Sequence, residues 1–64
     1  MDTFDAVIRR DGDWWMIRVP AIGLTQARRF ADVEGMVREI IAVTLDRDLD
    51  SFDVTITIDA VLEE

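Results

Sequence analysis

Between positions 33 and 45, apolar side chains and one threonine recur every three or four residues. This spacing constrains the fold more than any other feature. The offsets i, i+3, i+4, i+7, i+8, i+11 and i+12 are filled by Val33, Met36, Val37, Ile40, Ile41, Thr44 and Leu45. This is one stripe of an amphipathic helix, which we expect over residues 31–46. Gly35 within it indicates either close packing on a neighbouring element or a tolerated cost, and one sequence does not separate the two.

Strands are predicted before this helix. Alternation of apolar and polar residues predicts a first strand over 3–10, and Asp11-Gly12-Asp13 has the composition of a hairpin turn. The apolar run that follows predicts a second strand over 14–19. Pro20 ends that strand because proline cannot donate a hydrogen bond to a neighbouring strand.

Two further strands complete the predicted set. A turn at Ala21-Ile22-Gly23 leads to a short polar strand over 24–29, whose composition suits an exposed sheet edge. After the helix, strict alternation over 52–59 is typical of a half-buried strand. Residues 60–64 are expected to form a short tail.

The resulting order, strand-strand-strand-helix-strand, predicts one α+β domain spanning residues 1–64. If the last strand returns through a right-handed crossover, it lies parallel to the first, which gives a mixed sheet of order 3-2-1-4 with the helix on one face. The strand residues expected to meet the helix are Phe4, Ala6, Ile8, Trp15, Ile17, Val19, Phe52, Val54, Ile56 and Ile58. Their partners on the helix are expected to be Val33, Val37, Ile40 and Ile41.

The opposite face of the sheet is predicted to stay open. Trp, Met and Arg together are enriched at protein interfaces. We therefore expect a partner or self-association interface on this face, although ordinary solvated sheet surface is the alternative. Its predicted members are Val7, Trp14, Met16, Arg18, Thr55 and Thr57.

The composition argues against catalysis and cofactors. The chain has no His, Cys, Lys or Tyr, so it lacks the usual general bases and the thiol and amine nucleophiles. Asp46, Asp48 and Asp50 are spaced like the start of a calcium loop, but Ser51 and Thr57 stand where such a loop needs Gly and Glu. We expect a protein that is not an enzyme and holds no metal or cofactor.

Charge limits the partners. The net charge is −7; residues 14–29 carry three Arg and no acid, whereas residues 46–64 carry seven acids and one Arg. This acidity disfavours direct nucleic-acid binding. No apolar run is long enough to span a bilayer, and the start of the chain is unlike a signal peptide, so we expect a cytoplasmic protein that does not bind membranes.

A chain this small gains stability from association, so we expect a homo-oligomer, in its simplest form a dimer. Two modes of association fit the sequence. Either the edge of the last strand or the open sheet face would form a two-fold contact.

Several short pieces in succession carry a resemblance to a known family. They are Asp11-Gly12-Asp13, Val19-Pro20, Gly23, Thr25-Gln26 and the helix stripe over 33–41. In this order and spacing, the stretch over about residues 4–58 resembles the N-terminal domain of HicB-family antitoxins. The resemblance implies a partial ribonuclease-H-like fold with the strand and helix order derived above.

It also implies a function. HicB-like domains are non-enzymatic inhibitors that mask a small basic toxin, an mRNA-cleaving ribonuclease of the HicA type. Family members usually continue into a C-terminal DNA-binding domain, which these residues do not supply, so we do not expect DNA binding here. The alternative is a stand-alone oligomerising or adaptor domain that shares only the fold and has no toxin partner.

Overall fold

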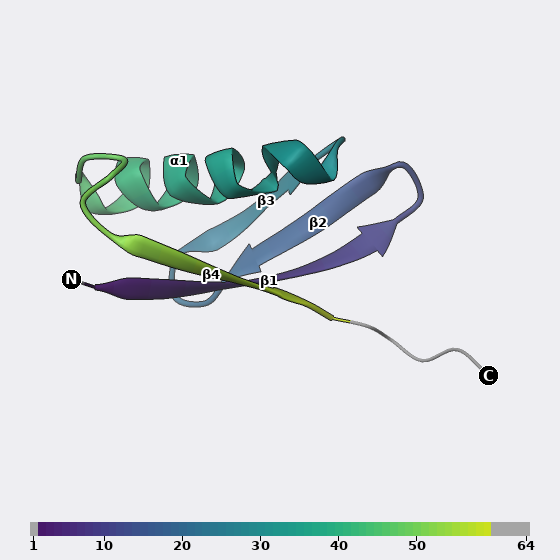
Figure 1. Cartoon of the computed structure of the whole chain (residues 1–64), viewed down its shortest axis with the longest axis horizontal. Coiled ribbons are helices and arrows are strands. Elements are labelled where there is room, and N and C mark those ends of the chain that lie inside the picture. Colours follow the sequence, from purple (N-terminus) through teal and green to yellow (C-terminus); the bar gives the residue numbers. More distant parts are fainter. Residues whose placement is uncertain (1, 60–64) are drawn as a thin grey trace.

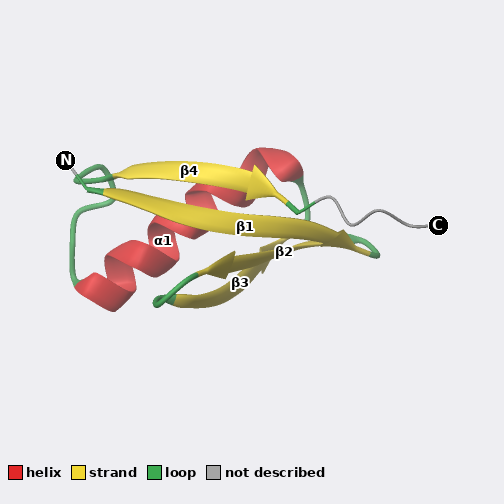
Figure 2. Ribbon diagram, turned by 90° about the horizontal axis from the view of Figure 1, so that it is seen from below, coloured by secondary structure: helices red, strands yellow, loops and turns green. Residues whose placement is uncertain are grey.

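The computed structural model describes residues 2–59, so the tail expected over 60–64 lies outside the described residues. Its elements follow the order β1 (Thr3–Asp11), β2 (Trp14–Val19), β3 (Gly23–Ala27), a 3-10 turn (Phe30–Asp32), α1 (Val33–Leu45) and β4 (Asp53–Ile58). The strands form one mixed sheet of order β3-β2-β1-β4, which confirms the predicted α+β topology. α1 lies along one face of the sheet, and Figure 2 shows it crossing behind the strands at an angle (Figure 1).

Two tight turns connect the first three strands. Gly12 has φ +63° at the first central position of the two-residue turn between β1 and β2, which is the type II′ requirement for glycine. The next turn is closed by the Ile22 N–H, which donates to the Val19 carbonyl at 2.9 Å. Ala21 takes φ +68° there, in the position where a type II turn favours glycine.

Pairing between the strands explains the order of the sheet. β1 and β2 are antiparallel, with Ile8 opposite Ile17. β1 and β4 are parallel, with Thr3 beside Asp53 and Ile8 beside Ile58. The helix provides the crossover that a parallel pair needs, because the chain must return to the starting end of the sheet.

The core lies between α1 and the sheet. Its buried members come from the predicted stripe and the predicted faces, with Ala27 added: Ala6, Ile8, Ile17, Val19, Ala27, Val33, Val37, Ile41 and Phe52. Half-buried residues pack around them: Phe4, Trp15, Ile22, Met36, Ile40, Val54 and Ile56. One predicted core residue is misplaced, because Ile58 is 52% exposed. β4 begins close to the helix and then diverges from it, so the end of the strand lies beyond helix cover (Figure 1).

The bounds of β3 and α1 differ most from the sequence prediction. The third strand ends at Ala27 and not at Arg29, because the chain leaves the sheet to begin the 3-10 turn, where Arg29 contacts Asp32 at 3.3 Å. The α-helix begins at Val33, after that turn, and ends at Leu45. Asp46 then takes a left-handed conformation with φ +56° and forms the C-cap.

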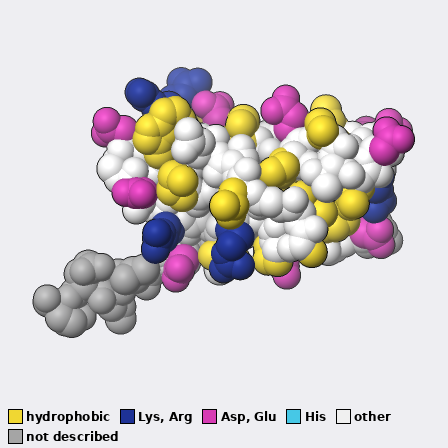
Figure 3. Space-filling model, turned by 180° about the vertical axis from the view of Figure 1, so that it is seen from behind, with side chains coloured by type: hydrophobic (Ala, Val, Ile, Leu, Met, Phe, Trp, Pro, Cys, Tyr) yellow, Lys and Arg dark blue, Asp and Glu magenta, His cyan; other side chains and the backbone are white. Residues whose placement is uncertain are grey.

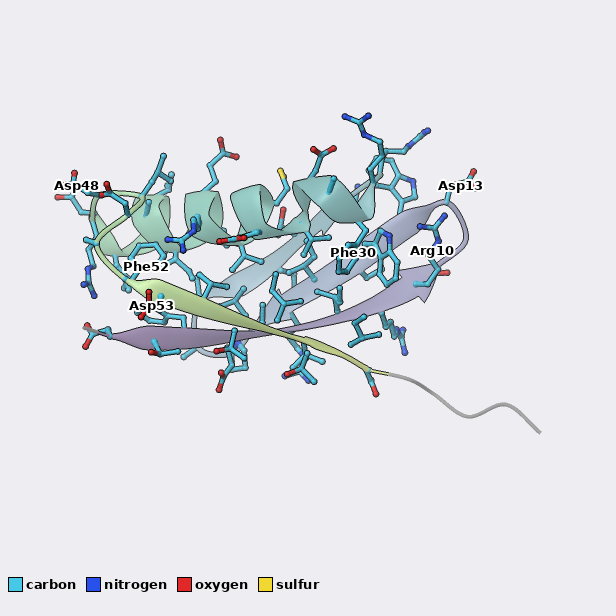
Figure 4. All side chains as sticks on the ribbon, viewed as in Figure 1. Arg10, Asp13, Phe30, Asp48, Phe52 and Asp53 are labelled. Atoms are coloured by element: carbon cyan, nitrogen blue, oxygen red, sulfur yellow. The ribbon has the colours of Figure 1, made fainter. Side chains whose placement is uncertain are left out.

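An arginine-rich corner holds α1 to the loop that precedes β4. Arg38 donates to the carbonyls of Leu49 and Phe52, both at 2.9 Å, and to the Glu34 carboxylate at 3.0 Å. The ring of Phe52 packs edge-on against Phe4 with centroids 5.4 Å apart. Figure 4 places Phe52 beneath the helix, at the end of the molecule opposite Phe30 and Arg10 (Figure 4).

A second arginine completes this corner. Arg47 donates to the Ser51 carbonyl at 3.0 Å and to the Asp2 carboxylate at 2.8 Å. That hydrogen bond from Arg47, together with its positive charge, lowers the pKa of Asp2. Arg47 therefore ties the loop between α1 and β4 to itself and to the residue before β1.

Candidate functional site: a groove on the open face

The face of the sheet opposite α1 carries a groove of about 440 Å³. Antiparallel pairing sets its floor, because Val7 lies opposite Arg18 and Arg9 lies opposite Met16. Directly opposed residues share a face, so these four side chains project from the same side of the sheet. Leu24 extends the groove onto β3, where it lies opposite Arg18.

Apolar side chains in this groove are accessible to a partner. Leu24 is 72% exposed and Met16 is 36% exposed, while Val7, on β1, is half-buried. Figure 3 views the molecule from behind, toward its β3 edge, and shows hydrophobic side chains spread along that edge with charged ones among them (Figure 3). A sheet surface that mixes exposed Leu and Met with Arg has the composition of a protein interface.

Charge in the groove is mixed. Arg9 and Arg18 line it together with Asp11 and Asp59. Among the hydrogen bonds found for residues 2–59, none joins the side chain of Arg9 or Arg18 to another group of the chain. Both guanidinium groups can therefore bind a partner's carboxylate or carbonyl groups without breaking an internal contact.

The predicted interface residues do not all meet in this groove. Val7, Met16 and Arg18 do, and the structure adds Arg9 and Leu24 to them. Thr55 and Thr57 are exposed on β4, on the same face, but they do not line the groove. The predicted six-residue surface is thus divided between the middle of the sheet and its β4 edge.

Trp14 occupies a different place from the one expected. Its ring lies under the guanidinium of Arg28, with the Cζ atom 4.6 Å from the ring centroid, and it is half-buried. It borders a second hollow of about 590 Å³, which reaches around β3 to Met36 and Glu39 on α1. The adjacent Trp15 lies on the helix face, packed edge-on against Phe30 at 5.4 Å with Arg10 on the ring.

Leu24 is the apolar groove side chain that the predicted interface left out. The signal was its position in β3, because the residue opposite Arg18 has to face the same side. That register depends on the turn from Val19 to Ile22, whose hydrogen bond shifts the start of β3 to Gly23. Leu24 is therefore the most exposed apolar side chain of β3, a strand that was predicted to be polar.

The acidic loop after α1 shows structural roles for its backbone. Asp46 caps the helix, and the carbonyl of Asp48 accepts hydrogen bonds from the backbone and the hydroxyl of Ser51. Over the described residues, no three acidic side chains converge in a group that could hold a metal ion. The groove itself offers a partner apolar contact and two guanidinium groups.

Comparisons with known proteins add no relative. No protein-family model matches this sequence, and neither a curated protein nor a solved structure matches it significantly. Across residues 2–59, the one α-helix is too short to cross a lipid bilayer.

Proposed function

We propose that the domain is a non-enzymatic protein-binding module that masks a small basic toxin, an mRNA-cleaving ribonuclease of the HicA type. The observation that carries this proposal is the groove on the open face, where Met16 is exposed opposite Arg9 and Leu24 is exposed opposite Arg18. The sheet order and the single helix also agree with the fold that the HicB resemblance implies.

The charge of the chain supports a basic partner. A net charge of −7 attracts a cationic protein over long distances and raises its association rate. The contact itself needs apolar area and oriented polar groups, which Met16, Leu24 and the two arginines supply. In this proposal the overall charge brings the partner in and the groove holds it.

The same charge is the reason to propose that the domain does not bind nucleic acid directly. An acidic protein gains nothing from phosphate contacts, whereas covering the RNA-binding surface of a basic ribonuclease inhibits it without touching RNA. We place this activity in the cytoplasm, where mRNA is cleaved.

A second candidate function is a stand-alone oligomerising or adaptor domain with no toxin partner. The observation that favours it is the outer edge of β4, which pairs with no strand within residues 2–59. The two candidates differ in what the open-face groove contacts. A toxin inhibitor loses its activity when the groove is altered, and an oligomerising domain loses only self-association when its edge is altered.

The test is co-expression with a small basic protein encoded beside this chain, followed by pull-down and measurement of growth. We expect Met16→Asp and Leu24→Asp each to abolish co-purification and rescue, because a charge in the groove removes apolar contact. Val43→Asp is the matched control, since Val43 is 78% exposed on α1, outside the groove. The proposal is wrong if no basic partner co-purifies, or if the groove variants rescue as well as the control.

A further inference from the structure

The outer edge of β4 presents unpaired backbone groups. The N–H groups of Asp53 and Asp59 point inward, where they donate to the carbonyls of Asp2, just before β1, at 2.8 Å and of Ile8, in β1, at 2.7 Å. Successive residues of a strand alternate in direction. The N–H and C=O groups of Val54, Ile56 and Ile58 therefore point outward, where no strand among residues 2–59 pairs with them.

This edge lacks the features that usually prevent pairing. Between Asp53 and Asp59 it reads Val-Thr-Ile-Thr-Ile, with no charge, no proline and no bulge. β3, at the other edge, is one residue shorter and carries Thr25 and Gln26 at its centre. It also lies against the helix, since a Cβ on Gly23 would be 3.2 Å from Ile40 Cδ1.

We propose that two copies of the chain pair through their β4 edges, antiparallel and in a register centred on Ile56. This register matches every outward-facing residue of the strand, with Ile56 opposite its own copy and Val54 opposite Ile58 of the second copy. The two sheets join into one, with both helices on one side and both grooves on the other. The inference concerns a second copy of this chain and does not rest on the proposed toxin.

Side chains on the two faces support the same register. On the helix side, it places Val54 of one copy against Ile58 of the other, and Ile58 is the apolar residue that α1 leaves 52% exposed. On the open side it places Thr55 opposite Thr57, and Thr pairs stabilise adjacent strands. α1 leaves the end of β4 exposed, and in the proposed dimer the second copy covers it.

Charge at the ends of the strand makes the pairing weak. In this register Asp53 of one copy lies opposite Asp59 of the other, twice in each dimer, and opposed like charges destabilise a strand pair. We therefore expect the dimer to tighten severalfold when Asp53 is replaced by Asn, and also when the salt concentration rises. A dimer held by ion pairs would respond to salt in the opposite way.

The first experiment is sedimentation equilibrium of the full chain up to high micromolar concentration. We expect a monomer–dimer equilibrium that Ile58→Lys removes, because a charged side chain protects an edge and cannot pack on Val54. Leu24→Lys is the control, since Leu24 is exposed on β3, and it should dimerise like the parent. A monomer mass throughout, or loss of the dimer in the Leu24 variant alone, would overturn the proposal.

The second experiment fixes the register by cross-linking, using the absence of native cysteine. Opposed residues that do not share hydrogen bonds lie close enough for a disulfide, at a Cα separation of about 4.5 Å. A mixture of Thr55→Cys and Thr57→Cys chains should oxidise mainly to the mixed dimer. Preferential coupling of Thr55→Cys chains to each other would indicate a register centred on Thr55 and would overturn the proposed one. The proposal also fails if the mixed dimer forms no faster than the disulfide dimer of a Leu24→Cys control.

Discussion

The two sides of the sheet differ in how much of each residue's role is structural. On the helix side, Ile17 and Val19 are buried and Trp15 packs between Phe30 and Arg10. On the open side, their neighbours Met16 and Arg18 line a groove and are exposed. One strand thus alternates between residues that the fold requires and residues that it leaves available, so adjacent substitutions should separate stability from binding.

The largest expected difference in stability is between two variants that place a carboxylate on opposite sides of β2. Ile17→Asp buries a carboxylate in the core and should cost about 4 kcal/mol or more, enough to unfold a domain of this size. Met16→Asp, at the next position, should change stability by no more than about 0.5 kcal/mol. Urea unfolding followed by circular dichroism measures both, and similar losses in the two variants would show that the open side is also structural.

The next largest effect tests whether the stability of the helix side depends only on apolar packing. Arg38→Ala removes the hydrogen bonds to the Leu49 and Phe52 carbonyls and should cost about 2 kcal/mol, as expected for charged donors. Arg29→Ala is the control, because Arg29 contacts only the exposed Asp32 and should cost under about 0.5 kcal/mol. Equal unfolding midpoints for the two variants would mean that the corner around Phe52 is held by packing alone.

A smaller effect contrasts two glycines, one facing solvent and one facing the helix. A Cβ at Gly35 meets no atom within 4 Å, so this glycine is tolerated and not close-packed. Gly35→Ala should therefore raise the free energy of unfolding by about 1 kcal/mol through helix propensity. Gly23→Ala should lower it, because the new Cβ would meet Ile40 at 3.2 Å at a backbone φ of +156°. A loss at both positions in thermal melts would contradict the distinction.

The smallest effect concerns acid stability at the arginine corner. Because Arg47 lowers the pKa of Asp2 in the folded state, this pair stabilises the fold above the unfolded pKa of about 3.9 and ceases to do so as pH falls through the folded pKa. Asp2→Asn should flatten the fall in melting temperature below about pH 4 slightly. Asp5 forms no ion pair within residues 2–59, so Asp5→Asn should leave that slope steeper than Asp2→Asn does.

Periodicity was sufficient to predict the element order, the sheet order and the two faces. It succeeded because alternation assigns each strand residue to a side, and the stripe of α1 fixes which side is covered. Ile58 shows the limit of that rule, since alternation gave its side correctly, but sheet twist carries the end of β4 away from the helix. How far a helix reaches over a twisted sheet is a property of the whole fold.

The candidate site was predicted only in part, for a related reason. Val7, Met16 and Arg18 were assigned to the open face and do line its groove. Trp14 was expected beside them, but its ring lies under Arg28, a residue that leaves the sheet to enter the 3-10 turn. Alternation does not determine which neighbour a large ring packs on, because that choice depends on where the next segment turns.

The parallel pairing of β1 with β4 has a consequence for synthesis of the protein. β1 is synthesised first, but its parallel partner β4 is synthesised last. Phe52, one of the largest buried side chains, is also added late. Contacts so distant in sequence form slowly, and a nascent chain released before position 52 would lack both the strand and the ring that close the core. Interrupted translation would therefore yield fragments that cannot fold and that proteases remove, so only chains completed through β4 would accumulate.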